Sequence, residues 1–112
     1  MTNKEAYRKY LDAVIDDYER FQNVSFSGRT EIQAKMLQDF IQGLSFKTGN
    51  KYVKVMSGGS VHSFIVNTDK DEKFKMGDIL KPANWKTPAR NAARGNIYGD
   101  YSVNWTGPNY LR

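Results

Sequence analysis

Residues 51–67 read KYVKVMSGGSVHSFIVN, the clearest β-pattern in this chain of 112 residues. Both halves are rich in Val, Ile, Tyr and Phe, which favour strands, and the SGGS segment at 57–60 separates them. Glycine adopts the positive φ angles that tight hairpin turns require. The pattern therefore predicts two antiparallel strands, at 51–56 and 60–67, joined by a hairpin turn.

The segment before this hairpin has apolar residues at steps of three and four, the period of one helix face. Capping boxes at 2–5 (TNKE) and 30–33 (TEIQ) favour helix starts at both places. We expect a first helix over 3–22 and a second over 30–43, with Gly43 close to its end. Because the linker is short, the two helices should form an antiparallel hairpin that covers the sheet.

The segment after the hairpin is richer in Gly and Pro. Residues 74–80 are typical of a turn that feeds a third strand, which should stop before Pro82. A Thr-Pro pair at 87–88 favours a helix start and a Gly-Asn pair at 95–96 favours a C-cap, so a helix of two turns is predicted over 88–94. Residues 97–98 and 102–106 are candidate final strands.

This element order predicts an α+β fold in a single domain of residues 1–112. An N-terminal helical hairpin, residues 1–46, should pack on a small antiparallel β-sheet of three to five strands. The sheet belongs to a β-rich basic part, residues 47–112, which also holds the short helix near 88–94.

Composition excludes several classes of protein. The chain has no Cys, which excludes disulfides and thiolate metal sites. No apolar run approaches the roughly 20 residues of a membrane-spanning helix, and the first residues lack the apolar stretch of a signal peptide. We therefore expect a cytoplasmic protein that has no membrane partner.

Charge and aromatic residues are unevenly distributed. Residues 1–46 carry six Lys/Arg and seven Asp/Glu, a net charge of −1, whereas residues 47–112 carry eleven and five, a net charge of +6. Cations attract phosphates and flat rings stack on bases, so the basic half suits nucleic acid. Aromatic residues and Arg are also the usual anchors of protein–protein contacts. Both kinds of partner are therefore compatible with this inventory.

The candidate binding surface combines the cations, rings and amides of the carboxyl-terminal part. Its members are Trp85, Lys86, Arg90, Asn91, Arg94, Tyr101 and Tyr110, with Lys51, Lys54 and Lys81 as candidate phosphate contacts. On the predicted helix, Arg90 and Arg94 would share a face and could grip phosphates or carboxylates, although a solvated helix face is the simpler alternative.

The two tryptophans allow structural and functional interpretations. Trp85 lies in a loop between two prolines, where its ring either fills the edge of the core, which we favour, or marks a binding site. Alternation over 102–106 puts Val103 and Trp105 on one face, so we interpret Trp105 as a core residue rather than a stacking platform.

Catalysis has little support in the residue pattern. His62 is the only histidine, and no motif supplies it with an orienting carboxylate, a nucleophile or further metal ligands. We interpret it as a structural strand residue. The SGGS segment lacks the Lys and the helix of a phosphate-binding loop, and neither a nucleophile elbow nor a zinc motif is present. We expect a non-catalytic protein with no cofactor and no metal.

Several carboxyl-terminal segments resemble a group of small conserved proteins of unknown function encoded by tailed bacteriophages. These segments are SVHSFI (60–65), FKMGDILKPANW (74–85), PAR (88–90), ARGNI (93–97) and WTGPNYL (105–111). The resemblance covers about residues 50–112. It implies a phage-encoded protein that acts in the cytoplasm of the host bacterium, or a virion component, and it implies no functional residue.

Two hypotheses follow for the function. In the first, the protein binds a host or phage protein, with Trp85, Arg90, Arg94 and Tyr110 as anchors, or forms a homodimer through the same surface. In the second, it binds nucleic acid by contacting phosphates. We favour the first here, because the excess charge is modest and no recognised nucleic-acid motif is present. Both require the carboxyl-terminal cations and rings to meet on one exposed surface.

Overall fold

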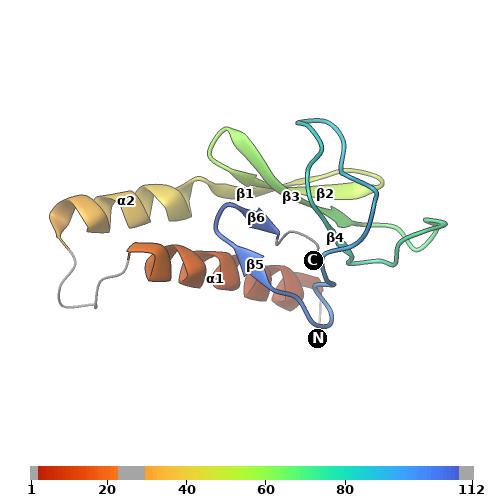
Figure 1. Ribbon diagram of the computed structural model, residues 1–112, viewed down its shortest axis with the longest axis horizontal. Coiled ribbons are helices and arrows are strands. Elements are labelled where there is room, and N and C mark those ends of the chain that lie inside the picture. Colours follow the sequence, from red (N-terminus) through yellow and green to blue (C-terminus); the bar gives the residue numbers. More distant parts are fainter. Residues whose placement is uncertain (1–2, 23–29, 109–112) are drawn as a thin grey trace.

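An antiparallel β-sheet organises the structure, a computed structural model that describes residues 3–22 and 30–108. Within these residues the sheet has four strands in chain order: β1 (Leu44–Thr48), β2 (Tyr52–Ser57), β3 (Ser60–Val66) and β4 (Ile79–Leu80) (Figure 1). The predicted hairpin is β2–β3, and Gly58 turns it with a φ of +61°. The α+β class and the antiparallel sheet are thus confirmed.

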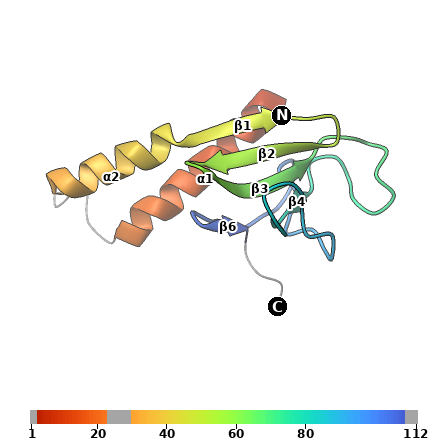
Figure 2. The same ribbon diagram turned by 90° about the horizontal axis from the view of Figure 1, so that it is seen from above.

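Helix α1 (Asn3–Gln22) covers one face of this sheet, as Figures 1 and 2 show. It buries one side chain per turn, at Ala6, Tyr10, Val14 and Tyr18, a spacing that places all four on a single face. The first three pack against Val53, Val55, Ile65 and Ile79, which point from β2, β3 and β4 toward the helix. This cluster is the main core, and it confirms the first predicted helix.

Helix α2 (Glu31–Gln42) begins at the predicted capping box, in which Thr30 Oγ1 accepts from the backbone N–H of Gln33 at 3.1 Å. It runs opposite to α1, and Phe40 stacks on Tyr18 with 4.3 Å between ring centroids. None of residues 31–42 is buried, however, and α2 extends beyond the sheet before the chain enters β1 (Figure 2). Only α1 therefore covers the sheet, which corrects the expectation for the second helix.

Strand β1 was not expected, since residues 44–46 were counted with the helical hairpin and the KTGN sequence at 47–50 is typical of a turn. Its sequence, LSFKT, alternates apolar and polar residues, and Phe46 packs edge-on against Tyr7 of α1 at 5.2 Å. Lys47 lies on the opposite face of the strand, directly across from Lys54 of β2. This register places two lysines side by side.

A β-bulge shifts the register between β2 and β3. Val55 pairs with Ser63 and Met56 pairs with Val61, which leaves His62 as the extra residue on β3. In regular alternation His62 would share the face of Phe64. The bulge instead lets His62 and Ser63 both approach Tyr10 on the α1 side.

The predicted helix at 88–94 is absent, and the chain has no regular secondary structure there. It runs beside β4, where the backbone N–H of Arg94 donates to the Ile79 carbonyl at 2.7 Å and the N–H of Ile79 donates to the Gly95 carbonyl at 2.9 Å. A helix of two turns is unstable alone, and pairing with an open sheet edge satisfies the same backbone groups. Gly95 adopts a φ of +138°, which favours glycine.

The outer face of the sheet, away from α1, carries a second buried cluster of Phe64, Val66, Phe74 and Leu80. Phe74 comes from the segment between β3 and β4, and Ala93, from the segment after β4, packs against the cluster. Residues 97–98 form a turn instead of a strand. The last elements, β5 (Val103–Asn104) and β6 (Gly107–Pro108), form a hairpin whose turn residue Trp105 packs between α1 and α2.

Candidate functional site

Trp85 belongs to the loop of residues 82–88, and Figure 1 shows this loop on the side of the sheet away from α1. A bridge between Pro82 and Pro88 closes the loop. Inside it, Asn84 Oδ1 accepts from the backbone N–H groups of Lys86 at 2.8 Å and Thr87 at 2.9 Å. The loop is thus held by its own hydrogen bonds, and it leaves the indole 49% exposed. The expectation that Trp85 fills the edge of the core is wrong.

Two lysines of the sheet contact this indole. Lys54 Nζ lies 3.9 Å from the ring centroid of Trp85 and Lys47 Nζ lies 5.2 Å from it. The two residues are direct cross-strand partners on β1 and β2, so their side chains rise from the same face of the sheet. We call Lys47, Lys54, Trp85 and the exposed neighbour Lys86 the tryptophan–lysine surface.

Opposing charges are missing from this surface. Among the residues that the structure describes, neither Lys47 nor Lys54 forms an ion pair with a carboxylate. The sequence contains no Asp or Glu between Asp39 and Asp69, nor between Asp78 and Asp100. The first of these stretches includes β1, β2 and β3, and the second includes the Trp85 loop. The tryptophan–lysine surface is therefore cationic, and Lys47 and Lys54 stand directly opposite each other on it.

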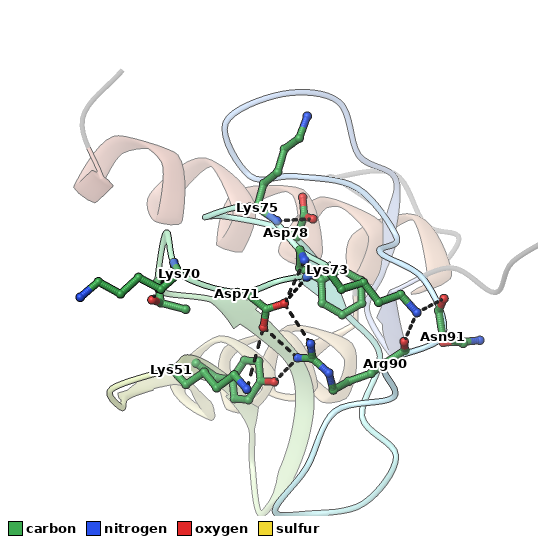
Figure 3. Close-up of polar contacts among 11 residues, drawn as sticks. Lys51, Lys70, Asp71, Lys73, Lys75, Asp78, Arg90 and Asn91 are labelled. Carbon is green, nitrogen blue, oxygen red and sulfur yellow. Dashed lines mark hydrogen bonds and ion pairs between the residues drawn. The ribbon is translucent and has the colours of Figure 1, made fainter.

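Arg90, a predicted binding residue, is held in an ion pair (Figure 3). Its guanidinium donates to both carboxylate oxygens of Asp71, at 2.9 and 3.0 Å, and to the Tyr52 hydroxyl at 2.6 Å. The guanidinium also lies 4.8 Å from the ring centroid of Phe74. The Asp71 side chain is 1% exposed, and hydrogen bonds from Arg90 hold the pKa of that carboxyl well below its usual range. This pair ties the 67–78 segment to the residues that follow the Trp85 loop.

Other cations surround the same pair. Lys51 Nζ approaches Asp71 at 3.9 Å, and Lys73 Nζ donates to the backbone carbonyls of Arg90 at 2.6 Å and Asn91 at 3.0 Å (Figure 3). Tyr52 and Lys54 are two residues apart on β2 and so point to the same face of the sheet. The Arg90–Asp71 pair therefore adjoins the tryptophan–lysine surface, with its own charges already paired.

The remaining predicted residues lie in several places. Arg94 donates to Asn91 Oδ1 at 3.2 Å and to a backbone carbonyl at 3.3 Å, so the two arginines share no helix face. Tyr101 is half-buried, with its ring centroid 5.4 Å from that of Tyr10, and Lys81 is half-buried after β4. Tyr110 lies outside the described residues. Of the predicted set, Lys54 contacts Trp85, and Lys86 follows Trp85 in the same loop.

Lys47 is the member of this surface that sequence reasoning missed. It was assigned to a turn, although the LSFKT alternation at 44–48 was a signal for a strand with Lys47 on its polar face.

His62 belongs to a buried polar chain. Its Nε2 lies 2.8 Å from the carbonyl oxygen of Asn104 and must donate to it, so Nδ1 accepts from the Ser63 hydroxyl at 3.0 Å. Ser63 Oγ in turn accepts from the Tyr10 hydroxyl at 2.9 Å. Burial lowers the pKa of His62 and raises that of Tyr10, which keeps both neutral. His62 is 2% exposed and Ser63 0%, so neither reaches a substrate.

Two further features are apolar. A groove of about 860 Å³ lies between α1 and β1, and its lining residues include Tyr7, Leu11 and Phe46 as well as Lys4 and Arg8. Helix α2 exposes Ile32, Met36 and Ile41. No cluster of metal-binding side chains occurs in the described part of the chain.

Comparison of the chain with protein-family models, with curated proteins and with solved structures found no match. The helices that the structure describes are too short or too polar to cross a membrane. The function must therefore be inferred from the geometry of the site.

Proposed function

We propose that this protein binds nucleic acid, without catalysis, through the tryptophan–lysine surface. The observation that carries the proposal is the directly opposed pair of Lys47 and Lys54 beneath the Trp85 ring, neither of which forms an ion pair with a carboxylate among the described residues.

Such a pair is unfavourable in the unbound protein. Like charges directly opposite each other on neighbouring strands destabilise a sheet by roughly 0.2–1 kcal/mol. The indole offsets part of this, since an exposed cation–π contact is worth about 0.5–1 kcal/mol. A phosphate bound between the two ammonium groups would remove the remaining repulsion.

This proposal is the second of the two hypotheses from the sequence, and two observations favour it over a protein partner at this surface. Arg90, one of the two arginines expected to anchor a protein, is already paired with Asp71. The free cations are lysines, which are depleted in protein–protein interfaces but common at phosphates. The exposed apolar residues of α2 suit a protein better, and they lie on a different element.

The resemblance to small proteins of tailed bacteriophages supplies a context for the proposal. Such a protein would act in the bacterial cytoplasm, where nucleic acids are abundant anions. Its single domain would need neither a cofactor nor a metal for this role.

Fluorescence polarisation with labelled DNA and RNA oligonucleotides, at about 50 and 200 mM salt, tests the proposal. Three lysines that each neutralise one phosphate of a single strand predict a slope of about −2 for log K against log salt. The double variant Lys47→Gln/Lys54→Gln should weaken binding and reduce the slope to about −0.7.

The matched control is Lys4→Gln/Lys9→Gln, which removes the same charge from exposed positions of α1, on the other side of the sheet. It should leave most of the affinity intact. Absence of binding at low salt, or equal losses in the two double variants, would contradict the proposal.

A further inference from the structure

Resting on the proposed function, we infer that Trp85 stacks on an unpaired base, which makes single-stranded nucleic acid the ligand class. Phosphate binding needs only the lysines. Stacking gives the Trp85 ring a role of its own, which is to bind a base.

The indole contacts two lysines and still keeps a large exposed area. Lys47 and Lys54 rise from adjacent strands toward it, and both ammonium groups contact the ring from the direction of the sheet. Nearly half of the side chain remains exposed. A base can stack on the open part while its flanking phosphates reach the lysines, as in single-strand binding sites that alternate rings and cations.

The loop also holds the ring in position before any ligand arrives. The Pro82–Pro88 bridge and the hydrogen bonds to Asn84 Oδ1 restrain the tip. Ala83 and Asn84 donate from their backbone N–H groups to the Thr87 carbonyl, at 3.0 and 3.2 Å. A restrained ring loses little conformational entropy on binding, so stacking yields more net affinity than it would on a mobile loop.

Duplex DNA offers this ring little to bind. Its bases are already stacked, and sequence readers reach their edges with a helix or a β-ribbon in the major groove. Here β1 and β2 belong to a four-stranded sheet with the Trp85 loop over its outer face, so neither a free two-stranded ribbon nor a helix is presented, and α1 packs on the opposite face of the sheet. The lysines can contact duplex phosphates, but the indole has no exposed base face to cover.

The stacking role predicts a specific loss. Alanine substitution of a ring that stacks on a base lowers single-strand affinity by about 5- to 150-fold. Trp85→Leu should produce a loss in this range and leave the salt slope unchanged, because all lysines are retained. Trp85→Phe, which keeps a smaller ring over the lysines, should lose less affinity than Trp85→Leu.

The experiment titrates wild type, Trp85→Phe and Trp85→Leu with a labelled oligo-dT single strand, an RNA equivalent and a mixed-sequence DNA duplex of equal length. Circular dichroism verifies that each variant is folded. Indole emission is recorded as a second readout, because stacking on a base quenches it and a purely electrostatic contact does not. We expect tighter binding of single strands than of duplex, and quenching that disappears in Trp85→Leu.

Failure of the inference differs from failure of the proposed function. Equal, salt-dependent affinity for single strand and duplex, with no effect of Trp85→Leu and no quenching, would overturn the stacking role and retain phosphate binding. Absence of binding to all three ligands would overturn both. If Trp85→Leu weakens duplex binding as much as single-strand binding, the ring only positions the lysines, and the inference is wrong.

Discussion

The substitution Lys47→Glu should stabilise the fold and weaken ligand binding. Lys47 faces Lys54 directly across β1 and β2, so a glutamate at this position converts a like-charge pair into an ion pair. If the lysine pair is maintained for a ligand, stability and affinity must move in opposite directions. If the lysine pair instead stabilised the fold, Lys47→Glu would lower both the stability and the affinity.

The magnitude follows from three terms. Removal of the repulsion contributes about 0.5 kcal/mol, and the new cross-strand ion pair contributes about 0.5 kcal/mol more. Loss of the contact between Lys47 and the Trp85 ring, at 5.2 Å, costs about 0.5 kcal/mol. The net stabilisation is about 0.5 kcal/mol, which corresponds to a rise in Tm of about 2–4 °C for a domain of this size.

Thermal unfolding followed by circular dichroism measures this shift, with Lys47→Gln as the control. The glutamine variant loses both the repulsion and the ring contact, so its Tm should stay close to that of the wild type. At about 1 M salt, where the Debye length is about 3 Å, the advantage of Lys47→Glu should disappear. A Tm below that of the wild type at low salt, or a gain that survives high salt, would refute the assignment of the pair as an electrostatic conflict.

Three other perturbations probe the framework around the site. Gly95→Ala should lower Tm strongly, since φ is +138° and the new Cβ would lie 2.5 Å from another Cβ, whereas Gly99→Ala meets nothing within 4 Å and should change little in the same scan. Burial lowers the pKa of His62 below its ordinary 6.5, so on acidification the unfolded chain is protonated at His62 before the folded chain is. Urea titrations should therefore show that the free energy of unfolding falls as the pH drops below about 6.5, whereas above this pH His62 causes no change in it. Asp71→Asn removes the partner of the Arg90 guanidinium and should lower Tm far more than Asp69→Asn at an exposed position. Because the pKa of Asp71 is lowered in the folded wild type, the contribution of its ion pair to the free energy of unfolding is complete at neutral pH and is lost as the pH falls below about 4.

Local signals predicted those parts of the fold in which the chain follows its own preferences. The first helix, the capping box at Thr30 and the β2–β3 hairpin match their expected positions to within a residue or two. In each, periodicity, cap and turn residues favour the same structure. The irregular segment at 88–94 was missed because Thr-Pro and Ala favour a helix locally, while the open edge of β4 offers backbone partners that only the folded chain supplies.

The candidate site was predictable only in part, for the same reason. Composition pointed to Trp85, Lys54 and Lys86, but their meeting with Lys47 depends on the register of β1 against β2. That register requires strand β1, whose five residues were not recognised as a strand in the sequence. Likewise, no local pattern indicated that Asp71 would pair with Arg90, nineteen residues away.

Chemical-shift mapping with a short single-stranded oligonucleotide and isotope-labelled protein tests the central claim most directly. The account predicts that amide shifts change at residues 45–48, 52–56 and 82–88, and that the Trp85 indole N–H shifts most among the side chains. Shifts confined to the two helices, or an unchanged spectrum at low salt and saturating oligonucleotide, would contradict it.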